Sequence, residues 1–183
     1  MRSRVLWMFA VTSAALLGAD PATSSIAKIF DQEISVIERE IVPLAEEMPA
    51  AKYGFVPGTG AFRNARTFHQ QVTHTAALLY MYGASILGEA NPSEPGPNDN
   101  GPASLATKED AVKYLKDAFG YVRKAVSSVT SENLTGMVKS AYGDFQVPRA
   151  SMVSAAIGHT WDHYGQMAVY ARLNSVIPPA SRR

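Results

Sequence analysis

Hydrophobic residues recur at three- and four-residue steps in four parts of the chain, and stretches rich in proline, glycine and asparagine separate these parts. This spacing places apolar side chains on one face of an α-helix. The pattern predicts helices over residues 24–48, 66–88, 107–129 and 148–173. No convincing strand pattern is present, although residues 145–147 have the pattern of a short extended piece. The predicted fold class is therefore all-α, and an antiparallel four-helix bundle is the simplest packing.

Residues near the ends of the predicted helices support these boundaries. Thr107 can cap its helix, and Pro148 suits a first helical turn. Pro43 falls inside the first pattern, so we expect the last turn of that helix to be bent or broken. Residues 90–106 are rich in proline, glycine and asparagine and have little to bury. We expect them to form a solvated connection, and a lid over a site is the alternative.

The beginning of the chain has the pattern of a secretory signal peptide. A basic start precedes an apolar run over residues 5–18, and a plausible cleavage point lies just before Asp20. The run is short for a membrane span, so an uncleaved anchor is the less favoured alternative. We therefore divide the chain into a signal peptide over residues 1–20 and a single domain over residues 21–183. This division predicts export to the periplasm or the cell exterior, without stable membrane insertion after cleavage.

Charge and composition exclude several classes of site. The formal net charge is +1, and no long basic run occurs outside Arg182 and Arg183, which argues against a nucleic-acid partner. The chain contains no cysteine, so disulfides, thiolate zinc sites and a cysteine nucleophile are excluded. Any bound metal must therefore be held by imidazole, carboxylate or water ligands.

The four histidines of the chain all fall within two of the predicted helices. His159 and His163 are four residues apart in the last helix, so both rings can reach one point. The inward stripe of this helix consists of Met152, Ala156, His159, His163, Met167 and Tyr170. Because neutral imidazole is a common ligand of transition metals, the pair predicts a metal site. Two core histidines bonded to neighbouring groups are the alternative.

A third ligand is expected from the helix over residues 66–88, which contains His69 and His74. Each of these histidines lies about 100° from the centre of the apolar stripe, on opposite flanks. Periodicity therefore does not choose between them. For either one, a surface or interhelical histidine is the default interpretation.

Polar neighbours of the histidine pair are further candidates. Asp162 can accept a ring N–H or orient a water, although on the helix it points about 100° away from the pair. Tyr164 and Gln166 are candidate hydrogen-bond partners of the ligands, with packing as the alternative role. Trp161 is better suited to a core or an interface. None of these residues is identified as catalytic.

The last helix resembles the C-terminal motif of the DinB-like metal-binding bundles. The motif runs from His159 through His163, Tyr164, Gly165 and Gln166 to Asn174, and Pro178 and Pro179 follow it. The segment from Arg66 to Ala76 resembles the first ligand region of that family, and residues 47–57 also fit. The resemblance covers residues 24–179, and the motif of the last helix is its most specific part.

The resemblance implies an up-up-down-down four-helix bundle, often dimeric, that binds a divalent metal. The implied ligands are the pair in the last helix and one histidine of the second. The family's ligand precedes small apolar residues, which selects His74 over His69 and makes His69 a neighbour of the site. Tyr164 stands where many members have arginine. The signal peptide is also unusual beside the family's thiol-dependent transferases, whose thiols are cytoplasmic.

The predicted metal ligands are therefore His74, His159 and His163, holding Zn, Ni, Fe or Mn as a divalent ion. Three protein ligands leave a coordination position open, which is typical of catalytic sites. The first hypothesis is a metal-dependent transferase or hydrolase that acts on a small molecule. We expect the protein to form a homodimer and not to bind nucleic acid. The alternative is a non-catalytic, exported metal-binding bundle for stress response or metal handling. The third hypothesis is a helical bundle whose histidines bind no metal.

Overall fold

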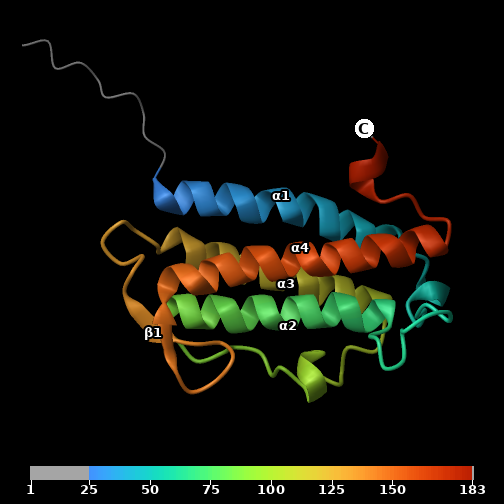
Figure 1. Ribbon diagram of the computed structural model, residues 1–183, viewed down its shortest axis with the longest axis horizontal. Helices are drawn as coiled ribbons and strands as arrows, with labels where there is room; N and C mark the ends of the chain where they lie inside the picture. Colours follow the sequence, from blue (N-terminus) through green and yellow to red (C-terminus); the bar gives the residue numbers. More distant parts are fainter. Residues whose placement is uncertain (1–24, 183) are drawn as a thin grey trace, which may run out of the picture.

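The computed structural model describes residues 25–182, and the predicted signal peptide over residues 1–20 lies outside this range. These described residues form four long helices (Figure 1). They are α1 (Ile26–Glu47), α2 (Phe68–Leu87), α3 (Lys108–Ser127) and α4 (Arg149–Leu173). Every boundary lies within two residues of its prediction, so the all-α fold expected from hydrophobic spacing is confirmed.

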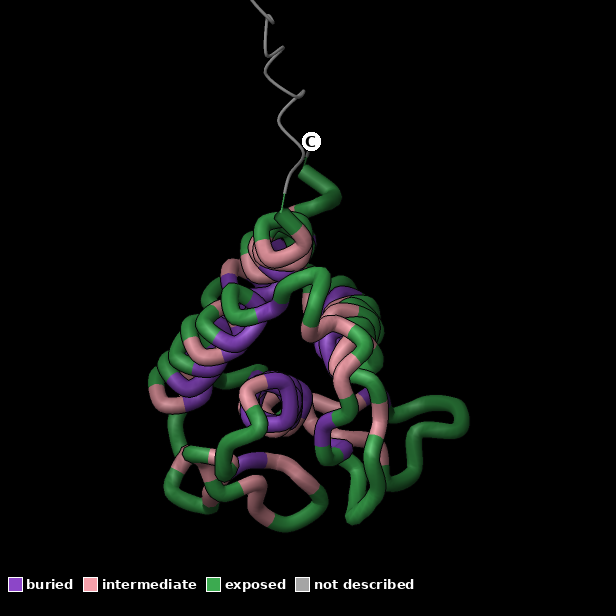
Figure 2. The backbone as a smooth tube through the Cα atoms, turned by 90° about the vertical axis from the view of Figure 1, so that its left-hand side faces the viewer, coloured by how far each residue is buried: buried purple, intermediate pink, exposed green. Residues whose placement is uncertain are grey.

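The four helices form a bundle in which α1 and α2 lie on opposite sides (Figure 2). Helices α3 and α4 each pack against both α1 and α2. The apolar stripes meet in one continuous core. Its largest fully buried side chains include Ile37, Phe68, Leu79, Tyr82, Leu115, Phe119 and Met167.

The helix directions differ from the expected up-up-down-down order. Arg123 near the end of α3 binds Asp31 near the start of α1, so these two helices are antiparallel. Arg149 at the start of α4 binds the carbonyl of Ile86 at the end of α2, so this pair is antiparallel too. Figure 1 shows α2 and α3 running the same way, which gives an up-down-down-up bundle. Parallel neighbours are possible because residues 88–107 can span about 3.3 Å each, more than twice the rise of a helical residue.

Two short strands join the end of α3 to α4. Strands β1 (Met137–Lys139) and β2 (Gln146–Pro148) form an antiparallel hairpin. The sequence predicted an extended piece only near β2, because strands of this length are too short to show alternation. Three short 3₁₀ turns complete the elements: η1 (Ala50–Lys52), η2 (Pro97–Asp99) and η3 (Pro179–Arg182).

Local signals begin and end the helices. Thr67 and Gln70 form a reciprocal capping box at the start of α2, and Thr107 and Asp110 form one at the start of α3. Helix α1 is not broken at Pro43 and continues to Glu47. Among residues 25–182, no helix combines the length and apolar character needed to cross a membrane.

The connection over residues 88–107 is largely exposed, as its composition predicts, but it also packs against the bundle. It runs along α2 on the side away from α1 (Figure 1), and the α2 tube is buried around most of its circumference (Figure 2). The ring of His69 contacts the Leu105 carbonyl through Nε2 at 2.9 Å. Such contacts use backbone carbonyls, so apolar periodicity does not reveal them. Helix α2 is therefore enclosed on both sides, which buries the histidine at its centre.

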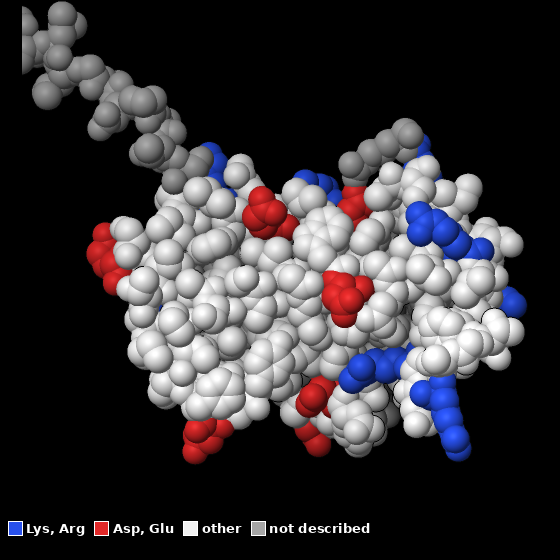
Figure 3. Space-filling view, in the orientation of Figure 1, with Lys and Arg blue, Asp and Glu red and all other residues white. Residues whose placement is uncertain are grey.

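On the face formed by α1, α4 and α2, most of the Lys and Arg side chains lie toward the right-hand end of the view (Figure 3). The Asp and Glu side chains lie mostly over the rest, and much of this face carries neither sign.

Candidate metal centre

Three histidines meet between α2 and α4. His74 comes from the middle of α2, and His159 and His163 come from successive turns of α4. Their candidate ligand nitrogens all lie within 4.8 Å of one another. The Nε2 atoms of His159 and His163 are 3.1 Å apart. The antiparallel packing of α2 and α4 thus brings together residues that are far apart in sequence.

The ring of His163 is held by a buried glutamine. Its Nδ1 lies 2.5 Å from Oε1 of Gln71, which is one helical turn before His74 and 2% exposed. The Gln71 amide nitrogen in turn donates to Oε1 of Gln166 at 3.0 Å. Because an amide oxygen only accepts, Nδ1 carries the proton. The lone pair of Nε2 is therefore directed into the histidine cluster.

The ring of His74 is oriented in the same way by the backbone. Its Nδ1 lies 2.8 Å from the carbonyl oxygen of Asp99, in the connection that covers α2. A carbonyl can only accept, so Nδ1 is the donor and Nε2 is the free ligand atom. Metal-binding histidines commonly donate their second ring N–H to such an oxygen.

His159 contacts His163 through Nε2, and packing alone holds the other side of its ring. Its Nδ1 is buried and has no hydrogen-bond partner among the described residues. The ring lies edge-on to Tyr82, with 5.7 Å between centroids, and 5.1 Å from the ring of His74. Its Nε2 faces that of His163, where two neutral imidazoles can share only one proton. This donor set therefore fits a metal ion, which would satisfy both facing nitrogens.

Burial keeps all three imidazoles neutral. Burial, followed by the charge of His74, lowers the pKa of His159 to about 4. Burial, followed by the charges of His159 and His74, lowers the pKa of His163 to about 3. Burial also lowers the pKa of His74, against the opposing effect of its bond to the Asp99 carbonyl. Neutral imidazole is the metal-binding form, so the cluster is ready for a metal at neutral pH.

The comparisons with known proteins agree with this arrangement. The model of the DinB superfamily matches residues 34–167, which include all three histidines. The chain belongs to the DinB superfamily. The resemblance seen in the motif of the last helix is thereby confirmed.

Two solved structures share the fold of this DinB-superfamily chain. A DinB-like protein from Bacillus cereus superposes with a TM-score of 0.62 at 16% identity, over 82% of this chain and 93% of that chain. A conserved protein from Enterococcus faecalis superposes with a TM-score of 0.65 at 14% identity, over 82% of this chain and 98% of that one. At these identities the likeness concerns the fold alone. A comparison with curated protein sequences gives no significant match.

The remaining candidates of this DinB-superfamily chain lie around the triad. His69 is outside the cluster and binds the Leu105 carbonyl. Asp162 is exposed and accepts from the Gln166 amide at 2.9 Å. Tyr164 points toward α1, where its hydroxyl makes a long 3.5 Å contact with Glu40. Trp161 is 37% exposed at the surface.

Sequence reasoning missed two groups that orient the ligands. Gln71 lies three residues before His74, and a polar residue at that spacing shares its side of the helix, so this signal was present. The Asp99 carbonyl left no signal, because backbone atoms are the same at every position. Gln166 was expected to donate to a ligand, but it accepts from Gln71 and reaches His163 only through that residue.

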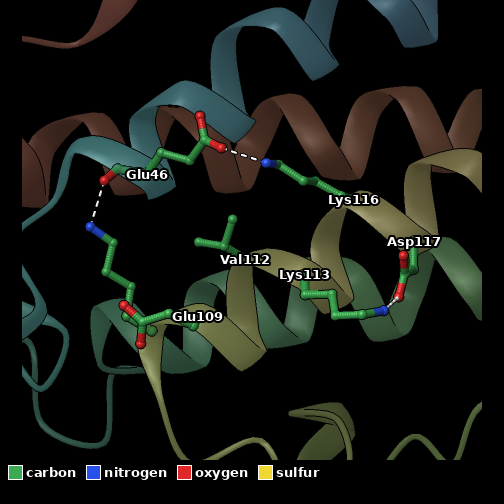
Figure 4. Close-up of a pocket in the computed structure, with 7 residues that line it drawn as sticks. Glu46, Glu109, Val112, Lys113, Lys116 and Asp117 are labelled. Atoms are coloured by element: carbon green, nitrogen blue, oxygen red, sulfur yellow. Dashed lines mark hydrogen bonds and ion pairs between the residues drawn. The ribbon is translucent and has the colours of Figure 1, made fainter.

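A hollow of about 450 Å³ between the end of α1 and the start of α3 has no histidine in its lining (Figure 4). Most of its charged side chains already have partners. Lys116 pairs with Glu46, Lys113 pairs with Asp117, and Lys108 donates to the Glu46 carbonyl. We therefore place the candidate site of this DinB-superfamily chain at the triad.

Replacing Gln71 with leucine should weaken metal binding by about 10–100-fold, the effect typical of losing the partner of a ligand. The His163 Nδ1–H would then be buried without an acceptor, which costs about 1–3 kcal/mol of folding stability. Gln71→Glu keeps an acceptor oxygen and should retain the affinity. Competition with a chromophoric chelator measures the affinity, and thermal melting measures the stability. Equal Zn²⁺ affinity in Gln71→Leu and the parent would contradict this role.

The metal-free protein should lose stability as the pH falls from about 6.5, the value of an unperturbed histidine, toward about 4. Below the unfolded-state pKa the unfolded chain binds protons that the folded His159 and His163 do not, so protonation favours unfolding. Above about pH 6.5, the contribution of the two neutral histidines to folding stability is fully present. Urea unfolding at several pH values measures it. In a His159→Gln, His163→Gln double variant, the free energy of unfolding should depend less steeply on pH over the same range.

Proposed function

We propose that this protein binds one divalent transition metal through Nε2 of His74, His159 and His163. The observation that carries the proposal is the convergence of three neutral imidazoles between α2 and α4. Two of them have their Nδ1–H groups bound to acceptors, which leaves Nε2 free. An all-nitrogen set suits Zn, Ni or Fe better than Mn, which prefers oxygen ligands.

We further propose that the metal serves a transfer or hydrolysis reaction on a small molecule. No carboxylate belongs to the cluster among the described residues, so three neutral ligands leave the ion's charge uncompensated. A bound ion would supply a Lewis acid and acidify a coordinated water or thiol. The chain's own contribution is to orient His74 and His163 and to shield them from water, since they are 6% and 4% exposed.

The same burial supports a second candidate, a non-catalytic metal-binding bundle. Two of the three ligands are almost inaccessible, and only His159 is partly exposed. A substrate would have to approach along the side of His159. In either case, export is a separate proposal that rests on the sequence of residues 1–20. Sequencing the N-terminus of protein recovered from cells would test it.

Metal content of the full chain tests the main proposal. The protein, purified without a histidine tag, is analysed by elemental mass spectrometry, then stripped with a chelator and titrated with Zn²⁺. We expect close to one equivalent per chain in both experiments. Failure to bind any of Zn²⁺, Ni²⁺, Fe²⁺ or Mn²⁺ would overturn the proposal. Turnover of thiol, ester or amide substrates by the metal-loaded but not the stripped protein would distinguish the enzyme from the metal-binding bundle.

A further inference from the structure

A short segment, Asn98–Asn100, is held between the metal cluster and an arginine. On one side the Asp99 carbonyl accepts from Nδ1 of His74 at 2.8 Å. On the other side Arg66 donates from Nε to Oδ1 of Asn100 at 2.9 Å and from Nη2 to the Asn98 carbonyl at 3.1 Å. All three residues of the segment are thus bound to side chains at or just before α2.

The backbone of this segment adopts an uncommon conformation. Asn98 and Asp99 have φ values of 56° and 55°, although neither is glycine. Non-glycine residues in this region cost of order 1–3 kcal/mol each unless their surroundings stabilise them. Here the surroundings are the bonds to Arg66 and His74 and the backbone bonds of the turn. The backbone bonds run from the N–H groups of Asp99, Asn100 and Gly101 to the carbonyls of Gly96, Pro97 and Pro95 at 3.2, 3.2 and 2.7 Å. The conformation that points the Asp99 carbonyl at His74 is therefore held both by the turn itself and by the bonds to Arg66 and His74.

Arg66 is itself fixed in place. Its carbonyl accepts from the hydroxyl of Tyr170 on α4 at 3.1 Å, and the guanidinium is partly buried. Arg66 takes part in no ion pair among residues 25–182. Its guanidinium donates to two residues of the segment, Asn98 and Asn100. The planar guanidinium suits this task because it offers several donors in a fixed geometry.

We propose that Arg66 is a positioning residue for the metal site, acting on His74 through Asn98–Asn100. The proposal rests on the metal-binding function proposed above. Arg66 holds the segment, the segment presents the Asp99 carbonyl, and the carbonyl keeps the proton of His74 on Nδ1. Without that acceptor the ring can rotate or carry its proton on Nε2, and either change removes the ligand lone pair from the cluster.

A purely electrostatic role for Arg66 predicts the opposite effect. The positive charge of Arg66 lowers the pKa of all three histidines, so it lies close enough to repel a bound cation. Removing that charge alone would strengthen metal binding. Losing the segment's conformation would weaken it. The sign of the change in affinity therefore separates positioning from simple repulsion.

The test compares Zn²⁺ affinity in the full-length parent, Arg66→Ala and Asn100→Ala, by competition with a chromophoric chelator. Asn100→Ala removes an acceptor of Arg66 without changing any charge. Arg63→Ala is the matched control, because Arg63 is exposed. This substitution removes the same charge as Arg66→Ala but leaves the bonds of the segment in place. We expect about tenfold weaker binding in the first two variants, the low end of the effect of losing a ligand's partner. The control should bind as the parent does.

Limited proteolysis gives a second readout that does not depend on affinity. In the metal-free protein, cleavage within residues 96–101 should be faster in Arg66→Ala than in the parent. In the parent, Zn²⁺ should slow this cleavage, because coupling between the metal and the segment is reciprocal. Circular dichroism checks that each variant is folded. If Arg66→Ala does not fold, the Zn²⁺ affinity of Asn100→Ala decides the test.

The outcomes separate cleanly. Weaker Zn²⁺ binding in both variants, with faster cleavage in Arg66→Ala, supports the positioning role. Unchanged or tighter binding in folded Arg66→Ala and Asn100→Ala overturns it while leaving the metal site intact. A parent that binds no Zn²⁺ overturns the metal-binding function itself, and the positioning role with it.

Discussion

Replacing His159 with alanine should reduce metal binding by more than about 100-fold, beyond the loss expected when only a ligand's partner is removed. His159 supplies one of three ligand nitrogens, and two imidazoles alone leave a weak site. This variant suits the test because the His159 Nδ1 has no partner among the described residues, so its removal strands no acceptor there. Zn²⁺ titration with chelator competition measures the loss, and circular dichroism confirms that the bundle is intact.

The matched control is His69→Gln. His69 is also an α2 histidine, five residues before His74, but it binds the Leu105 carbonyl and lies outside the cluster. Glutamine keeps a donor for that carbonyl while removing the imidazole. We expect this variant to bind Zn²⁺ like the parent. Equal loss in both variants would mean that binding reflects histidine content rather than the triad.

The helices and half of the site could be predicted from the sequence, because both depend on local spacing. The stripe that places Met152 and Met167 in the core also turns His159 and His163 inward. Periodicity could not choose between His69 and His74, because α2 has no polar side to contrast with its apolar stripe. The family resemblance selected His74, and the structure brings that histidine into the cluster.

The features that could not be predicted from the sequence depend on contacts that do not affect the hydrophobic pattern. The direction of α3 follows from the path of residues 88–107, which the composition suggested were solvated. That connection is largely exposed, but it also runs along α2 and presents the carbonyls of Leu105 and Asp99 to two histidines. The polar environment of the site is therefore built by the segment that looked least structured.

Gly96→Ala should destabilise that segment far more than Gly88→Ala. Both glycines lie in the same connection and have positive φ values, 68° and 72°. Gly88, with ψ 27°, is in the left-handed helical region, where a side chain costs about 1–2 kcal/mol. Gly96, with ψ 179°, is in a region that essentially only glycine adopts, so a side chain there is strained as well. The surroundings differ: a Cβ on Gly96 would lie 1.8 Å from the Gly101 carbonyl oxygen, whereas a Cβ on Gly88 would meet nothing within 4 Å. Only the first substitution forces the backbone apart.

The clash created by Gly96→Ala should also disturb the metal site. Opening the contact with Gly101 moves the residues between them, and Asp99 is one of these. We therefore expect Gly96→Ala to bind Zn²⁺ about tenfold more weakly, as when a ligand loses its partner, and to be cleaved faster within residues 96–101. Gly88→Ala should lose only stability in urea unfolding. If both variants bind Zn²⁺ equally well, His74 does not need the closed segment, and its orientation must come from packing within the bundle alone.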